Sequence, residues 1–195
     1  MANHGSIVLA SASPRRSELM NLAGISFSVV PADIPEDVLP GEQPADHVIR
    51  LSREKADAVA GTTTGRFFIG ADTVVALGGR IMGKPVDETE AHEMLSALSG
   101  LSHEVITGFT VFDKVSGIHV SRAVRTEVVF KTLSKMEIDY YVATGCPMDK
   151  AGAYAIQGGA GHFVRAINGS YTNVVGLPMT ELYETLCQLG ALDVA

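Results

Sequence analysis

The order of strand-like and helix-like segments places the tightest limit on the fold of this chain. Residues 6–10 are apolar and lead into a Ser-rich turn, which predicts a short buried strand. A helix is then predicted to begin at Pro14, with Ser13 as its N-cap. Helices are also expected over 45–60 and 87–98, and strands over 25–30 and 67–77. This early alternation predicts an α/β domain.

The second half of the chain adds an antiparallel element. Two strand-like runs, 103–113 and 118–133, are separated by four residues, which predicts a hairpin. Ser134 and Glu137 form a capping box for a helix that runs to about Thr144. A glycine-rich stretch, 145–176, precedes a last amphipathic helix that carries Leu182, Leu186 and Leu189. A hairpin after alternating elements implies a mixed sheet.

Composition excludes several classes of protein. The 195 residues are 46% apolar and 19% charged, which allows one sizeable core, so residues 1–195 are expected to form a single domain. The formal charge of −7 argues against stable nucleic-acid binding. No bilayer-spanning run and no signal peptide are visible, so a cytoplasmic protein without membrane attachment is expected. Two cysteines are too few for a disulfide framework.

The segment from Ser11 to Arg16 lies at a predicted strand-to-helix turn. Free backbone N–H groups at a helix N-terminus favour an anion, and Arg15 and Arg16 could add charge-assisted hydrogen bonds. A phosphate site is therefore one interpretation. The other is an ordinary capped helix with two solvated arginines.

Asp72 interrupts an otherwise apolar strand. An ionisable residue in such a place must be paired, bind a cation or lie at a site, because an unpaired buried charge is costly. Backbone amides in a bend could also satisfy the carboxylate. The apolar neighbours on both sides favour a functional role for Asp72.

Two further segments could contact a ligand. Gly78 to Lys84 has the spacing of a phosphate-binding P-loop, but Pro85 replaces the required Ser or Thr, so that motif is rejected. Lys84 can still reach a phosphate, and Asp87 is expected to cap the next helix. In the segment 149–159, glycines permit close backbone approach, and Gln157 could read a base by donating and accepting hydrogen bonds.

Together these segments resemble the Maf family of nucleoside triphosphate pyrophosphatases. The matching blocks occur in the family order and cover nearly the whole chain, and only their combination is specific. They are Leu9–Arg16, Arg53–Ala56, Gly70–Val75, Gly83–Pro85, Met94–Leu95, Leu98–Gly100, His103, Thr107–Gly108, Asp149–Tyr154, Ile156–Gly158, Ile167–Tyr171 and Val175–Pro178.

The resemblance implies a fold and an activity. The expected fold is an elongated α/β structure of the Maf/ITPase-like type, with a curved mixed β-sheet flanked by helices and a cleft between two lobes that are not independent domains. The implied reaction is hydrolysis of a nucleoside triphosphate to the monophosphate and pyrophosphate, with Mg²⁺ or Mn²⁺ as cofactor. A homodimer is also implied.

Residue roles follow from the matching positions. In the family the Asp of the G-A-D-T block is the assigned proton acceptor, which here is Asp72. Arg15, Thr73 and Gln157 match the branch that acts on dTTP and UTP, with modified pyrimidine nucleotides as further substrates in a house-cleaning role. The branch that acts on 7-methylguanosine triphosphate usually carries Trp and Glu at the first and third of these positions. This chain has no tryptophan.

A triphosphate needs cations around it, because it carries about four negative charges. The expected catalytic residues are Asp72, Lys55 and Lys84, and the expected metal ligands are Glu36 and Asp72, with Asp33 in reserve. The expected substrate-binding residues are Ser11, Arg15, Arg16, Thr73, Lys150 and Gln157.

Two positions depart from the family pattern. Pro35 interrupts the usual Ile followed by two acidic residues, and Cys146 stands where the family usually has Glu. Two alternatives remain open, the second of them because of these departures. One is the same chemistry on 7-methylguanosine triphosphate or another nucleotide, and the other is a catalytically silent nucleotide sensor linked to cell division.

Overall fold

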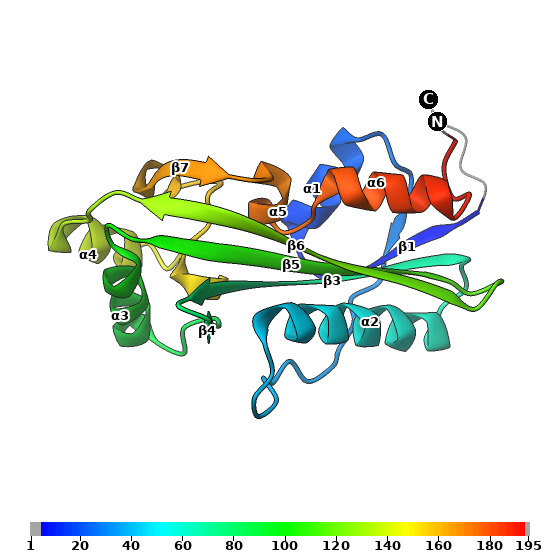
Figure 1. The fold of residues 1–195 in the computed structure, drawn as a ribbon, viewed down its shortest axis with the longest axis horizontal. Helices are drawn as coiled ribbons and strands as arrows, with labels where there is room; N and C mark the ends of the chain where they lie inside the picture. Colours follow the sequence, from blue (N-terminus) through cyan, green and yellow to red (C-terminus); the bar gives the residue numbers. More distant parts are fainter. Residues whose placement is uncertain (1–4, 194–195) are drawn as a thin grey trace. The chain divides into compact units, whose positions relative to one another are not determined.

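The computed structural model describes residues 5–193 and contains a mixed β-sheet flanked by helices, as expected (Figure 1). Its strands follow the order β2-β1-β3-β5-β6-β7, and β4 pairs with β3 off this path. The strands are β1 (Ile7–Ala10), β2 (Ser28–Val29), β3 (Phe67–Leu77), β4 (Arg80–Met82), β5 (Ser102–Asp113), β6 (Ile118–Phe130) and β7 (Val164–Asn168).

Six α-helices lie within the described residues, and most begin where the sequence predicts. They are α1 (Pro14–Leu22), α2 (Pro44–Thr62), α3 (Glu88–Leu98), α4 (Lys135–Ala143), α5 (Tyr171–Val175) and α6 (Met179–Gln188). Two short 3₁₀ turns, Ala151–Ala153 and Gly161–Phe163, lie between α4 and β7. Over residues 5–193, no helix combines the length and the apolar composition that crossing a bilayer requires.

The chain divides into two compact units. The first comprises the chain up to Asp72, Thr107–Val124 and everything from Gly176 onward. In it, β1 pairs in parallel with both β2 and β3, and Val8 lies opposite Ser28 on one side and Phe68 on the other. Helices α2 and α6 lie on opposite faces of these strands (Figure 1). Helix α2 packs against the sheet through a cluster of buried apolar side chains: Val8, Ala10, Ala56, Val59, Ala60 and Phe68.

The second unit comprises Thr73–Ile106 and Arg125–Val175. Strand β7 pairs antiparallel with β6, and β4 pairs antiparallel with the end of β3. Gly78 and Gly79, both at positive φ, form the tight turn between β3 and β4. The segment 78–84 is therefore a hairpin and not a strand–loop–helix, which agrees with rejection of the P-loop. This unit's core is mainly aliphatic and also contains buried aromatic side chains, among them Phe130, Tyr154 and Phe163.

Local capping signals predict the helix starts well. Pro14 occupies the first turn of α1 after Ser13, although the Ser13 side chain makes no capping hydrogen bond. Asp87 caps α3 by accepting from the Glu90 backbone N–H, and Ser134 forms the predicted capping box with Glu137. These signals work because they depend only on neighbouring residues.

One predicted strand is much shorter in the structure, and one strand was not predicted. The expected strand over 25–30 shrinks to Ser28–Val29, both exposed, because only these residues pair with β1 at that edge of the sheet. The glycine-rich stretch 145–176 contains β7. This strand has no continuous apolar pattern, and it forms by pairing with β6. Cross-strand pairing of this kind leaves no periodic signal within the strand itself.

Candidate functional site

The turn between β1 and α1 is held by Arg16. Its Nη1 donates to Ser11 Oγ at 3.0 Å and to the Ala71 carbonyl at 2.8 Å, and its Nε donates to the Gly176 carbonyl at 2.8 Å. Arg16 is 9% exposed, and burial lowers the pKa of its guanidinium, an effect that nearby Asp72 opposes. Ser11 Oγ also accepts from the Ser13 N–H at 3.2 Å. Arg16 therefore fixes three segments, while Arg15 beside it is half-buried.

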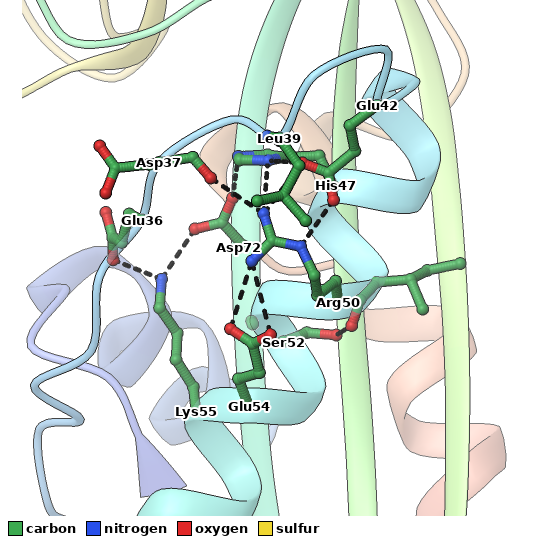
Figure 2. A network of polar contacts seen from close by, with 12 residues as sticks. Glu36, Asp37, Leu39, Glu42, His47, Arg50, Ser52, Glu54, Lys55 and Asp72 are labelled. Atoms are coloured by element: carbon green, nitrogen blue, oxygen red, sulfur yellow. Dashed lines mark hydrogen bonds and ion pairs between the residues drawn. The ribbon is translucent and has the colours of Figure 1, made fainter.

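Asp72 and Lys55 form a buried ion pair. Lys55 Nζ lies 2.7 Å from Asp72 Oδ1 and 2.6 Å from Glu36 Oε1, so one ammonium bridges two carboxylates (Figure 2). The Lys55 and Asp72 side chains are 8% and 11% exposed, whereas that of Glu36 is 43% exposed. The buried charge that the sequence places in β3 is therefore paired, as its cost requires. Asp33, the reserve ligand, is exposed.

Two glycines bring α2 close to the sheet. A Cβ on Gly70 would lie 1.9 Å from the Ser52 carbonyl oxygen, and one on Gly108 would lie 2.4 Å from the Val48 carbonyl oxygen. Any side chain at either position would push the helix away. Lys55 reaches Asp72 because α2 lies this close.

A second polar group adjoins the ion pair. Glu42 accepts two hydrogen bonds from Arg50, at 2.6 and 2.9 Å, and one from the Leu39 N–H at 3.0 Å (Figure 2). The Arg50 hydrogen bond is the main reason that the pKa of Glu42 falls to about 2. His47 Nδ1 lies 2.8 Å from Glu42 Oε2, and its Nε2 lies 4.0 Å from Asp72 Oδ2. This group links the loop before α2 to Asp72.

The sequence prediction omitted Glu42, His47 and Arg50. One signal for His47 was available, since His47, Leu51 and Lys55 are spaced by four and lie on one helix face, and all three are buried. Two polar residues within a buried stripe indicate a polar partner on the opposing strand. No comparable pattern marks Glu42, which lies outside the helix and is brought to it by Arg50.

The carboxylates of Glu36 and Asp72 fit a divalent cation that the substrate helps to bind. They converge on one positive group, the Lys55 ammonium, and Mg²⁺ is commonly held by one or two carboxylates plus phosphate oxygens and water. Among residues 5–193, no group of three or more His, Cys, Asp or Glu could hold a metal ion. Glu36 and Asp72 are the carboxylates that could hold such a cation, with phosphate oxygens and water as further ligands.

The remaining predicted site residues belong to the second unit. Thr73 follows Asp72 in β3 and is half-buried, and Lys84 and Gln157 are exposed. Lys150 Nζ donates to the Cys146 carbonyl at 2.6 Å and to Asp149 Oδ1 at 2.5 Å. The Gly152 N–H donates to the Gly83 carbonyl at 3.0 Å, so the loops that carry Lys84 and Lys150 are connected.

Of the predicted site residues, the first unit brings together Ser11 with Arg16, and Glu36, Lys55 and Asp72 with one another. The second unit connects the segments of Lys84 and Lys150. The chemistry of the first cluster is that of a buried carboxylate beside a fixed cation, which can orient a water molecule and accept its proton.

Two named relatives are similar to this chain over nearly its whole length. A dTTP/UTP pyrophosphatase of Geobacter sp. (strain M21) is 62% identical over 97% of this chain and 98% of its own length. The dTTP/UTP pyrophosphatase of Geobacter sulfurreducens is 61% identical over 96% of this chain and 98% of its own.

A solved structure of protein VC0702 from Vibrio cholerae aligns with 69% of this chain and 67% of its own, at 10% identity and a TM-score of 0.32, a likeness too low to bear on the fold. The model of the Maf-like protein family, in contrast, matches residues 6–189, almost the whole chain. The blocks that resemble this family in the sequence all fall within the matched range. The chain belongs to the Maf family.

Proposed function

We propose that this protein hydrolyses dTTP and UTP to the monophosphate and pyrophosphate. The observation that carries this proposal is the buried Asp72, held by Lys55 beside the carboxylate of Glu36. Relatives that are 60 to 62% identical over 96 to 97% of the chain bear the name dTTP/UTP pyrophosphatase, which supports the choice of substrates.

In the proposed reaction Asp72 acts as the general base. It accepts a proton from water while the water oxygen attacks the nucleotide, the α–β phosphoanhydride bond breaks, and its electron pair leaves with pyrophosphate. Lys55 keeps the Asp72 carboxylate in place through the 2.7 Å contact. The tight packing of α2 at Gly70 and Gly108 keeps this geometry fixed, which is what general-base catalysis requires.

Charge neutralisation is the second requirement. We assign Lys84 to the catalytic set and Arg15, Arg16, Lys150 and Ser11 to substrate binding, with Arg16 acting by holding the turn. Glu36 and Asp72 would hold Mg²⁺ or Mn²⁺, which, when bound, would neutralise phosphate charge and favour ionisation of water.

Selection of the base is assigned to Gln157, with Arg15 and Thr73. An amide offers both a donor and an acceptor, which suits the imide edge of thymine and uracil, whereas a carboxylate would suit the extra positive charge of a methylated guanine. The exposure of Gln157 is compatible with contact to a bound base. Modified pyrimidine nucleotides with the same edge are further proposed substrates.

A homodimer and a cytoplasmic location are additional proposals that come from the family resemblance. The formal charge of −7 supports the absence of stable nucleic-acid binding.

The direct test measures pyrophosphate release from dTTP, UTP, CTP and 7-methylguanosine triphosphate with Mg²⁺ or Mn²⁺. Wild type is compared with Asp72→Asn and with Asp46→Asn, which makes the same change at an exposed carboxylate on α2. We expect turnover of dTTP and UTP that is lost only in Asp72→Asn. Preferential turnover of 7-methylguanosine triphosphate would refute the choice of substrate, and binding without turnover of any triphosphate would refute the enzyme and favour a sensor.

A further inference from the structure

The surroundings of His47 give it a defined orientation that the reaction described above does not use. His47 is 3% exposed, and its Nδ1 lies 2.8 Å from Glu42 Oε2 (Figure 2). Glu42 in turn is fixed by the two Arg50 hydrogen bonds at 2.6 and 2.9 Å. Because the loop before α2 and the helix itself both contribute to this contact, Nδ1 of the ring is held against Glu42.

The contact with Glu42 determines which ring nitrogen carries the hydrogen. Arg50 keeps the pKa of Glu42 near 2, so this carboxylate only accepts hydrogen bonds at neutral pH. Nδ1 lies 2.8 Å from this carboxylate and farther, 3.3 Å, from Arg50 Nη2, so we assign the hydrogen of the Nδ1 contact to the ring. In the tautomer that carries its hydrogen on Nδ1, Nε2 is an acceptor, and it faces Asp72.

The two atoms that face each other cannot bond directly. Nε2 and Asp72 Oδ2 are 4.0 Å apart, beyond hydrogen-bond distance, and both are acceptors. A single water molecule can donate one hydrogen to each across such a gap. The other carboxylate oxygen, Oδ1, is held by Lys55, so Oδ2 is the oxygen turned toward His47.

We propose that His47 is a catalytic residue that, together with Asp72 Oδ2, orients the attacking water, and that Glu42 is a positioning residue acting through His47. This inference rests on the pyrophosphatase activity proposed above. As the water oxygen bonds to phosphorus, the water hydrogen that is donated to Oδ2 is transferred to Asp72. The hydrogen directed at Nε2 stays on the oxygen and leaves with the monophosphate, and the electron pair of the broken P–O bond leaves with pyrophosphate.

A purely structural role for His47 would predict a different pattern of variants. In that case only the Nδ1 contact matters, since it anchors Glu42 and the loop before α2. The Asn amide nitrogen is as many bonds from Cα as Nδ1, and the Gln amide atoms are as many bonds from Cα as Nε2. Asn therefore preserves the structural contact, and Gln preserves the contact with water.

The first experiment compares His47→Gln and His47→Asn with wild type, using kcat and KM for dTTP and the midpoint of thermal unfolding without nucleotide. We expect the kcat of His47→Gln to exceed that of His47→Asn by about tenfold or more, because misplacing a reactant can cost about 100-fold in rate, with KM within about twofold of wild type. Equal kcat values, or a higher kcat for His47→Asn, would overturn the proposal. An inactive wild type would instead refute the activity itself.

The second experiment does not depend on turnover. In protein labelled with ¹⁵N-histidine, the ring nitrogen shifts of His47, identified by their absence in His47→Gln, report which nitrogen bears hydrogen. We expect hydrogen on Nδ1 alone at the assay pH, and loss of this preference in Glu42→Gln. Hydrogen on Nε2, alone or together with Nδ1, would overturn the proposal because Nε2 could no longer accept from water.

Discussion

His47 and His103 are each only 3% exposed, but their surroundings are opposite in kind. His47 lies among Glu42, Arg50 and Asp72, all charged groups. His103 lies in the second unit among aromatic rings. Its ring centroid is 4.9 Å from that of Phe130, which it meets edge-on, and a 2.7 Å hydrogen bond joins its Nε2 and the Tyr154 hydroxyl. Burial alone does not therefore indicate a site, and the groups that face the ring decide its role.

The protonation of His103 follows from its apolar setting. Burial lowers its pKa to about 4 and raises that of Tyr154, and Nδ1 has no hydrogen-bond partner among residues 5–193. Such a histidine is confined to its neutral form and contributes to packing. The comparison predicts that changes around His47 affect activity first, whereas changes around His103 affect only stability.

The largest effect is expected from Lys55→Ala. It leaves Asp72 buried without its 2.7 Å partner, which should lower the free energy of unfolding by about 3 kcal/mol and the rate by about 100-fold or more. Urea unfolding and pyrophosphate release measure the two effects. The matched control is Lys114→Ala, because Lys114 Nζ, in the same unit, donates to a backbone carbonyl, that of Ala60 at 2.6 Å, and not to a carboxylate. Similar losses of activity in both variants would contradict the role of Lys55.

The next prediction tests the position of α2 without changing any of its charged side chains. Gly70→Ala puts a Cβ 1.9 Å from the Ser52 carbonyl oxygen, so α2 must shift, at a cost of about 3 kcal/mol and most of the activity. Gly61→Ala, in α2 but with no atom within 4 Å of the added Cβ, should instead stabilise the protein by about 0.5–1 kcal/mol. Thermal unfolding and turnover together test this pair. A Gly70→Ala variant as active as wild type would show that the close approach is not needed.

Sequence alone predicts features that neighbouring residues decide, and it misses those that depend on distant ones. The cost of an unpaired charge directs attention to Asp72, and capping explains where α3 and α4 begin. The Glu42–His47 contact depends on how a loop returns to a helix, and Gly70 is recognisable as a packing residue only once Ser52 is placed against it. Neither relation has a period or spacing that could be read along the chain.

His103 also predicts how stability depends on pH. The pKa of His103 is about 4 in the folded protein and about 6.5 in an unfolded chain, so between these values the unfolded state binds more protons. Stability should therefore fall as pH decreases from about 6.5 to 4, by about 3 kcal/mol in all. Urea unfolding across this range measures the slope.

Variants of His103 and Glu42 identify the pH range over which each of these groups changes the stability. His103→Phe should remove the slope between pH 6.5 and 4, and Glu42→Gln should leave that slope intact. The Glu42 pKa of about 2 implies a loss of stability only as pH falls below about 4.5. An unchanged slope in His103→Phe would show that another group is responsible.

The smallest effect is expected from Tyr154→Phe, which keeps the ring but removes the 2.7 Å hydrogen bond to His103 Nε2. The buried nitrogen then lacks a partner, which should cost about 1–2 kcal/mol of stability. The ring centroids of Tyr154 and Phe130 are 4.7 Å apart in an edge-on contact that the variant retains. The loss of stability therefore reports the hydrogen bond alone. We expect kcat and KM for dTTP to stay at wild-type values while the unfolding midpoint in urea falls. A reduced kcat in a variant that is folded at the assay temperature would contradict the distinction between the two histidines, because it would connect the aromatic core of the second unit to the reaction.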